Sequence, residues 1–171
     1  MTAGAAIRPA EPPDADAIAA VHCRAWRETY AGILPGAMIE GLTEAEAQAR
    51  WQRDIADPDV AVFVGETAAG VVGFVSAKPS DEPEAGFDGI LDTLYLLAAA
   101  QGTGLGRRLT EAAAAALADG GFREMGVVVH ADNPALGFYE AMGGRRVMER
   151  TRLHRGHMCP EVLLSWPLPL T

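Results

Sequence analysis

The stretch that decides the fold is residues 90–107, which read ILDTLYLLAAAQGTGLGR. Residues 90–97 are mostly apolar and predict a strand. Gly102, Gly104 and Gly106 follow in a loop, and apolar residues then recur at helical spacing. A helix that begins after such a loop presents unpaired backbone N–H groups and a positive dipole end, and glycines let an anion approach closely. The stretch therefore predicts a phosphate-binding turn between a strand and a helix.

Two other nucleotide-binding loops fit this stretch poorly. A Walker loop ends in Gly-Lys-Ser/Thr, whereas Gly106 is followed by Arg107 and Arg108. A dinucleotide fingerprint requires a glycine three residues after Gly104, where Arg107 stands, and it opens a βαβ chain instead of following a late strand. Taken alone, the loop is equally compatible with an ordinary strand-to-helix turn that binds no phosphate.

The composition indicates one globular domain spanning residues 1–171. Apolar residues make up 49% and charged residues 22%, a balance typical of folded proteins. The net charge of −9 repels the phosphate backbone of nucleic acids, so we expect no nucleic-acid partner. An acidic surface favours cationic ligands such as amines, although it is equally compatible with a role in solubility alone.

The sequence shows neither a membrane segment nor a secretory signal. The apolar runs are shorter than the roughly 20 uncharged residues of a membrane helix, and no basic segment precedes an apolar stretch near the N-terminus. The two cysteines, Cys23 and Cys159, form no disulfide framework and favour a reducing compartment. We therefore expect a cytoplasmic protein with no membrane partner.

The remaining elements mix helices and strands without the regular alternation of a doubly wound sheet. Asp14 is expected to cap a first helix, and Thr43 to open a second one through a capping box. Asn133 followed by Pro134 predicts the start of a short helix. Strands are expected at residues 7–10, 60–66, 71–78, 90–97, 125–130, 145–153 and 161–166, and helices at residues 14–30, 43–55, 104–119 and 134–142.

Two signatures in the chain resemble those of the GNAT superfamily of N-acetyltransferases. The first is the strand at residues 90–97 followed by residues 101–106, QGTGLG, which is similar to the family's acyl-CoA signature Arg/Gln-x-x-Gly-x-Gly/Ala. The second is residues 133–143, NPALGFYEAMG, which is similar to the family's asparagine followed by Phe/Leu-Tyr-Glu and a glycine. The resemblance implies an α/β (mixed α+β) fold, with a central mixed, mostly antiparallel sheet flanked by helices and splayed at its central strands.

The chain departs from the family pattern in three places. The spacing from Asn133 to Tyr139 is one residue shorter than in most members. Gly144 stands where the family usually has phenylalanine, and Ala98 where a proline often precedes the loop. The first departure makes the role of Asn133 a weaker inference than that of Tyr139, and the last is expected to reduce loop rigidity.

The resemblance also implies acetyl-CoA as cosubstrate, with no metal cofactor. The loop would bind its pyrophosphate, and main-chain N–H groups near Leu96 would orient the acetyl carbonyl where the central strands separate. The residues implied for cofactor binding are Leu94, Leu96, Gln101, Gly102, Thr103, Gly104, Leu105, Gly106, Arg107 and Asn133.

Two side chains are candidates for proton transfer. Tyr139 matches the family's tyrosine acid, which protonates the departing thiolate, and the alternative is a half-buried aromatic that supports the cofactor by packing. Asp92 is the one carboxylate in its strand and matches a position where many members have a glutamate that deprotonates the amine directly or through water. The alternative for Asp92 is a hydrogen bond to the main chain or an ion pair with an arginine.

The acceptor site is expected beside the end of the first helix. Trp26 and Tyr30 could form aromatic walls that hold an ammonium group by cation–π contact, although core packing is an alternative for Trp26. His154, His157 and Cys159 are close in sequence, but no fourth ligand accompanies them, so no metal site is expected.

These features predict an N-acetyltransferase that moves the acetyl group of acetyl-CoA to the amine of a small molecule, such as a polyamine or an amino acid, by direct attack in a ternary complex. Two alternatives remain open: an enzyme that acetylates protein N-termini or lysines, and a non-catalytic acyl-CoA-binding sensor. A homodimer is expected from the resemblance alone.

Overall fold

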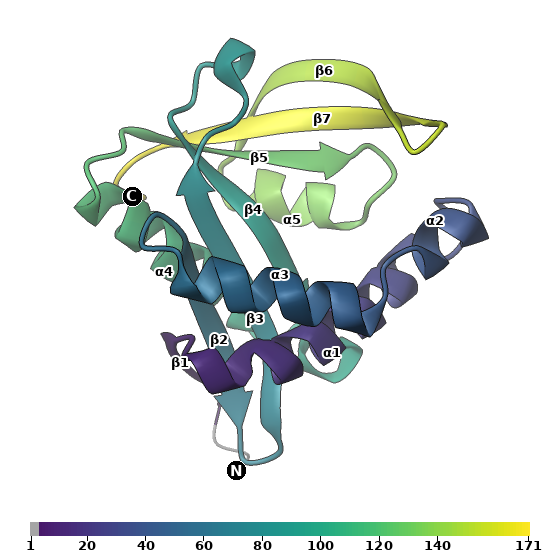
Figure 1. Cartoon of the computed structure of the whole chain (residues 1–171). Helices are drawn as coiled ribbons and strands as arrows, with labels where there is room; N and C mark the ends of the chain where they lie inside the picture. The colour runs from purple at the N-terminus through teal and green to yellow at the C-terminus, as the bar shows by residue number, and fades with distance from the viewer. Residues whose placement is uncertain (1–3) are drawn as a thin grey trace.

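The computed structural model of the protein describes residues 4–171, which form a seven-stranded sheet with helices on both faces (Figure 1). The strand order is β1-β2-β3-β4-β5-β7-β6, and every neighbouring pair is antiparallel except β4 and β5. This arrangement confirms the mixed, mostly antiparallel sheet. The strands are β1 (Ala6–Pro9), β2 (Ala61–Thr67), β3 (Gly70–Pro79), β4 (Gly89–Leu96), β5 (Glu124–His130), β6 (Arg145–His154) and β7 (His157–Pro167).

The helices divide between the two faces of the sheet. Figure 1 shows α1 and α3 side by side across β2, β3 and β4, while α4 lies on the opposite face and α5 beside β5. The helices are α1 (Ala15–Tyr30), α2 (Gly36–Glu40), α3 (Glu44–Ala56), α4 (Leu105–Asp119) and α5 (Ala135–Ala141), with 3-10 turns η1 (Pro12–Asp14), η2 (Pro83–Ala85) and η3 (Ala98–Ala100). No helix within residues 4–171 is both long and apolar enough to cross a membrane.

The alternation of side chains along β3 produces these two layers. Phe74 packs with Trp51 and Ile18 beneath α1 and α3, whereas the next residue, Val75, packs with Leu109 of α4. All five side chains are buried, and burying a large apolar side chain contributes about 1.5–3 kcal/mol. The sheet is therefore covered on both faces, and its strand ends remain available for a site.

The centre of the sheet is splayed, as expected. β4 and β5 are paired only at Gly89 with Met125 and at Ile90 with Gly126, and beyond these positions the two strands separate. A register shift in the β3–β4 ladder leaves Asp92 as an extra residue between two paired positions. Such a bulge bends its strand, and here it lies just where β4 departs from β5.

The structure corrects three expectations about local structure. Helix α1 begins after Asp14, but this residue has helical backbone angles and its carboxylate binds the Arg8 guanidinium at 2.7 Å instead of capping the helix. The sequence pattern missed helix α2. The last hairpin is longer than expected, because β6 and β7 pair as far as His154 with His157. The capping box of Thr43 and the cap from the Asn133 side chain to the Ala135 N–H are both present.

The acidic loop before β4 is tied to the hairpin of β6 and β7. Glu82 is buried, and its carboxylate accepts hydrogen bonds from Arg150 at 2.7 and 2.9 Å and from Arg152 at 3.2 Å. These guanidinium groups lower the pKa of Glu82 below its usual value. Glu82 therefore serves as an anchor for the hairpin and is not a solvated charge that could attract a cationic ligand.

Candidate active site

The glycine loop has the geometry that the sequence predicts. Gly102 and Gly104 have φ angles of 72° and 83°, a left-handed conformation that favours glycine. The first hydrogen bond of α4 runs from the Arg108 N–H to the Gly104 carbonyl at 3.2 Å, so the N–H groups of residues 105–107 have no partner within the helix. A Cβ at Gly102 or Gly104 would meet no atom within 4 Å, which leaves the loop surface open to a ligand.

A cavity of about 780 Å³ lies beside this loop, and we call it the loop cavity. It extends between the end of β4, the start of α4 and helix α5. Its lining is Glu28, Thr29, Leu94, Tyr95, Leu96, Ala98, Gln101, Gly102, Gly104, Gly106, Arg107, Asn133, Pro134, Ala135, Phe138, Tyr139, Ala141 and Met142. Nine of these are residues that the sequence assigns to cofactor binding or catalysis.

Two of the loop residues that the sequence assigns to cofactor binding, Thr103 and Leu105, have side chains that do not line the loop cavity. The Thr103 hydroxyl donates a hydrogen bond to the Ala100 carbonyl at 2.6 Å, which closes the turn. The Leu105 side chain is buried in the core, where it packs so closely on Gly65 that a Cβ there would come within 2.8 Å of it. Leu105 can therefore serve a ligand only through its backbone N–H. Arg108 is also directed away, because its guanidinium donates to the Ala5 carbonyl at 2.9 Å.

The splay leaves main-chain groups of β4 facing the loop cavity. The Leu97 N–H donates to the Val72 carbonyl of β3 at 2.9 Å. Because alternate residues of a strand direct their backbone groups to opposite neighbours, the Leu96 N–H points away from β3, toward the side from which β5 has departed. The Leu96 carbonyl accepts a hydrogen bond from the Gln101 side chain at 3.2 Å, which ties the strand end to the loop.

Tyr139 lines the loop cavity from α5. Its ring packs edge-on against Phe138 and Trp166, with ring centroids 5.2 and 5.9 Å away, and only 5% of the residue is exposed. This burial raises the pKa of the Tyr139 phenol. The side chain is therefore a neutral phenol at the cavity wall over the physiological pH range.

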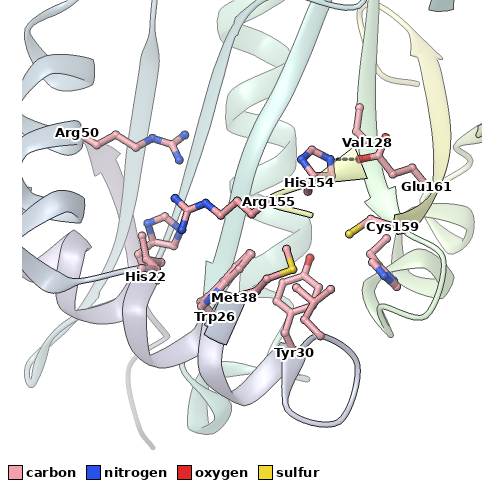
Figure 2. Close-up of a pocket in the computed structure, with 13 residues that line it drawn as sticks. His22, Trp26, Tyr30, Met38, Arg50, Val128, His154, Arg155, Cys159 and Glu161 are labelled. Atoms are coloured by element: carbon pink, nitrogen blue, oxygen red, sulfur yellow. Dashed lines mark hydrogen bonds and ion pairs between the residues drawn. The ribbon is translucent and has the colours of Figure 1, made fainter. Parts of the chain in front are cut away.

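A second cavity of about 330 Å³ lies between α1, α2 and the β6–β7 hairpin, and we call it the hairpin cavity (Figure 2). Its lining is His22, Trp26, Tyr30, Leu34, Met38, Leu42, Arg50, Val128, His130, His154, Arg155, Cys159 and Glu161. Both residues assigned to the acceptor, Trp26 and Tyr30, are among them.

Tyr30 connects the two cavities. Its ring lines the hairpin cavity, and its hydroxyl accepts a hydrogen bond at 3.2 Å from the side-chain amide of Asn133, which lines the loop cavity. The same asparagine caps α5 through its carbonyl oxygen. All three tyrosines of the chain line one cavity or the other, with Tyr95 and Tyr139 on the loop side.

Residues 21–144 match the model of the acetyltransferase (GNAT) family. The chain belongs to this family. It is 36% identical over 163 residues to YuaI of Bacillus subtilis (strain 168), an uncharacterised N-acetyltransferase, and the match covers 94% of this chain and 92% of the relative.

Two solved structures share the fold of this GNAT acetyltransferase. PaiA N-acetyltransferase of Thermoplasma acidophilum, in complex with coenzyme A, has a TM-score of 0.76 at 18% identity, covering 96% of this chain and 99% of that one. The putative acetyltransferase YncA of Salmonella typhimurium, with acetyl-CoA, has a TM-score of 0.72 at 20% identity, covering 97% and 95%.

One departure from the GNAT pattern has a packing reason. A Cβ at Gly144 would come within 2.7 Å of the Trp166 ring and 2.9 Å of the Tyr139 carbonyl. Trp166 occupies this space and donates a hydrogen bond to the Met142 carbonyl at 3.1 Å. The glycine therefore lets a tryptophan of β7 support the α5 end that carries Tyr139.

Asp92, the candidate base of this GNAT site, is engaged in ion pairs. Its carboxylate lies 2.7 Å from Arg50 and 3.5 Å from Lys78, and it lines neither cavity. Of the two roles that the sequence left open, these contacts correspond to the ion pair. Arg50 itself lines the hairpin cavity, so its ion pair with Asp92 holds in place a side chain of the cavity wall.

The histidines and cysteine of the hairpin do not converge on a metal. The His154 ring nitrogen lies 2.8 Å from Glu161, and the Cys159 thiol faces the His157 carbonyl at 3.7 Å. Within residues 4–171, no group of three or more His, Cys, Asp or Glu side chains is placed to hold a metal ion.

Several lining residues were not assigned from the sequence. Phe138 stands inside the second signature, and its ring is 3.5 Å from the position of a Cβ on Gly106. No local pattern indicates that His22 and Arg155 share a site. They are 133 positions apart in the chain, and only the tertiary fold brings them to one cavity. Tyr95 reaches the loop cavity although its ring stacks on His22 at 5.1 Å.

Proposed function

We propose that this protein transfers the acetyl group of acetyl-CoA to the amine of a small molecule, such as a polyamine or an amino acid, in a ternary complex. The observation that carries the proposal is the pair of cavities linked by the hydrogen bond between Tyr30 and Asn133. One cavity begins at an anion-binding loop, and the other is small and lined by aromatic rings. A transferase that binds both substrates in a ternary complex needs two connected sites of this kind.

The residues of the loop cavity fit acetyl-CoA. The N–H groups of residues 105–107 at the start of α4 would bind pyrophosphate oxygens, and Arg107, whose side chain is half exposed, would add positive charge. Leu94, Leu96 and Phe138 supply apolar walls for the pantetheine arm. The structures of the Thermoplasma and Salmonella proteins, which contain coenzyme A and acetyl-CoA, support this cosubstrate.

The chemistry is the attack of a neutral amine on a thioester. The amine nitrogen forms a bond to the carbonyl carbon, the carbon–sulfur bond breaks, and the sulfur leaves as a thiolate. The Leu96 N–H would stabilise the negative charge that develops on the carbonyl oxygen. The Tyr139 phenol would donate a proton to the sulfur, and the surplus proton of the nitrogen passes to water, from which the phenolate is reprotonated.

The Tyr139 phenol is available as a proton donor. A phenol is protonated at neutral pH even at its ordinary pKa near 10, and burial, which raises this pKa, leaves it protonated but makes it a weaker acid. The same apolar surroundings raise the pKa of the coenzyme A thiol, so the thiolate formed beside this ring is more basic, and burial alone does not oppose the proton transfer. The amine proton is lost to water in this scheme, because Asp92 is held by Arg50 and Lys78 away from both cavities.

Two further features belong to the proposal. Free thiols at Cys23 and Cys159, both buried, are consistent with a cytoplasmic location. The exposed side chains of Val147, Leu153 and Met158 lie on β6 and β7 and would be covered in a homodimer built through these strands.

The test is an acceptor screen with acetyl-CoA that reads the release of free thiol. Polyamines, amino acids, aminoglycosides and peptides with free N-termini form the panel. We expect turnover with at least one small amine and none with the peptides. Turnover confined to peptides would favour the protein acetyltransferase, and tight acetyl-CoA binding without turnover would favour the sensor.

A further inference from the structure

The hairpin cavity is lined by hydrogen-bond donors. The indole N–H of Trp26 is buried and has no hydrogen-bond partner within residues 4–171. Nδ1 of His22 accepts a hydrogen bond at 3.1 Å from Trp51, so the proton of the neutral ring is on Nε2. Burial lowers the pKa of His22 to about 4, which keeps this ring neutral at physiological pH. A buried donor without a partner is costly, but the Trp26 nitrogen has almost no accessible surface, so it faces packed atoms and not the open space of the cavity.

The charged side chains that line the cavity form ion pairs with residues outside it, and Arg155 is the exception. Arg50 is paired with Asp92 at 2.7 Å and with Asp54 at 3.3 Å. Glu161, the one carboxylate of the lining, is paired with Arg150 at 2.8 Å. Arg155 has no ion pair within the part of the chain that the structure describes. The uncompensated charge at this cavity is therefore positive, although the whole chain has a net charge of −9.

Arg155 has an unfavourable backbone conformation. It has a φ of 47° and is followed by Gly156 with a φ of 81°, in the two-residue turn that joins β6 to β7. Both positions of such a turn favour asparagine, aspartate or glycine, since an arginine with positive φ is strained. Residues with a strained backbone concentrate at functional sites, where the role of the side chain maintains a conformation that costs stability.

The Arg155 side chain extends across the cavity from this turn. Figure 2 shows the guanidinium directed from the hairpin toward the side on which His22 lies. On that side it meets Gly41, at the end of α2, where a Cβ would come within 2.5 Å of Nη1. The absence of a side chain at Gly41 thus leaves room for the guanidinium at the cavity mouth.

Another part of the lining is apolar. Leu34, Met38 and Leu42 come from α2 and its flanking loops, and Val128 comes from β5. A ligand that fits this cavity has one end with acceptor oxygens and negative charge and another end that is apolar. Tyr30 also lines this cavity, and its hydroxyl contacts Asn133 of the loop cavity, from which the acetyl group would come.

We propose that the acceptor is an amine that carries a carboxylate, namely an amino acid, whose carboxylate is bound by Arg155 and whose side chain packs on Leu34, Met38 and Leu42. The planar guanidinium fork matches a carboxylate. This inference rests on the proposed function and narrows its substrate class, and it selects against polyamines, which have no anionic group.

The first test compares three forms of one acceptor. The best substrate among the twenty L-amino acids is assayed beside its own amide and its decarboxylated amine, with spermidine as a polyamine. We expect kcat/KM to fall about tenfold or more when the carboxylate is removed, because hydrogen bonds to charged groups are the strong ones. Equal rates for the three forms would overturn the carboxylate site while leaving the acetyltransferase function intact.

The second test removes the guanidinium without harming the fold. Arg155→Asn places a residue that tolerates a positive φ in the turn, so we expect an equal or higher Tm. We expect KM for the amino acid to rise about tenfold, with kcat and KM for acetyl-CoA nearly unchanged. The matched control is Arg53→Asn, which removes an equal charge from an exposed position of α3 outside both cavities. An unchanged KM in Arg155→Asn would contradict the proposal.

A binding measurement separates this proposal from the proposed function. The N-acetyl amino acid and the N-acetyl derivative of the decarboxylated amine are titrated into the protein by calorimetry, which requires no turnover. Tighter binding of the carboxylate form, lost in Arg155→Asn, supports the site even if no amine releases thiol in the screen. Equal binding of the two forms overturns it whatever the screen finds.

Discussion

Tyr139 is a residue whose environment decides its chemistry. It is buried against Phe138 and Trp166 and lines the loop cavity, where the proposed function has a thiolate leave. Tyr139→Phe keeps the ring and removes the proton. We expect kcat to fall roughly tenfold to a thousandfold, near or below the usual general-acid contribution, with acetyl-CoA affinity nearly unchanged. Stopped-flow turnover and calorimetry measure the two quantities, and equal turnover in the variant across the pH range would leave Tyr139 a packing residue.

Asp92 is a residue whose partners argue for a structural role. Asp92→Asn breaks the pair with Arg50, whose side chain is 34% exposed against 24% for Asp92. We expect the free energy of unfolding to drop by about 1–2 kcal/mol, between the values for surface and buried pairs. We also expect a modest rate deficit that does not change with pH, since the proposed mechanism passes the amine proton to water.

The control for Asp92 is Asp54→Asn, which removes the other carboxylate partner of Arg50, on the surface of α3. A smaller loss of stability is expected there. A deficit in Asp92→Asn that is largest near neutral pH and shrinks at high pH, where free amine is plentiful, would instead identify Asp92 as the base.

At the scale of elements, α4 offers a matched pair of glycines. Gly104 precedes the helix with a φ of 83° and Gly121 follows it with a φ of 89°, and an added Cβ would meet nothing within 4 Å at either position. Replacing either by alanine should cost about 1–2 kcal/mol of stability, because both force a left-handed conformation on a residue with a Cβ. Only Gly104→Ala should weaken acetyl-CoA binding, since only Gly104 lies at the end where the free N–H groups face the loop cavity.

Calorimetry and thermal unfolding measure both effects of these glycine variants. Gly121→Ala controls for strain, and the bulkier Gly104→Val should weaken binding further than Gly104→Ala does. Equal acetyl-CoA affinity in Gly104→Val and in the parent protein would refute the assignment of the phosphate site to this loop.

At the scale of the whole molecule, an aromatic cluster surrounds a neutral histidine. His22 contacts the rings of Trp51, Phe74 and Tyr95, drawn from α3, β3 and β4. Burial lowers the pKa of His22 to about 4, below its ordinary value near 6.5. Between these two values the unfolded chain binds a proton that the folded protein does not, so stability falls as the pH decreases through this window.

We expect the free energy of unfolding to drop by about 2 kcal/mol between pH 7.5 and pH 5 from His22 alone. In His22→Asn this slope should be largely absent, although the variant is less stable at every pH. His157→Asn, at the hairpin turn, should retain the slope. Denaturant unfolding at several pH values measures it, and a parent-like slope in His22→Asn would show that other groups cause the acid lability.

What the sequence determined by itself is local. The left-handed glycines of the loop, the N-terminus of α4 and the cap of Asn133 depend on neighbours within a few residues, and the motif therefore predicted them. Apolar runs likewise predicted the strands, and the resemblance to the family predicted a sheet flanked by helices. The same is true of the family, because its signatures are short stretches of the chain.

The tertiary structure decided what is distant in the chain. Asp14 pairs with Arg8 instead of capping a helix, and Asp92 pairs with Arg50. No local sequence pattern reveals these oppositely charged partners. Arg155 lies in a turn that looks unremarkable in sequence, and only the packing of the hairpin against α1 and α2 brings its guanidinium to a cavity. Side-chain chemistry can be predicted from the sequence, whereas the partner of each group depends on strand register and helix packing, which long-range contacts determine.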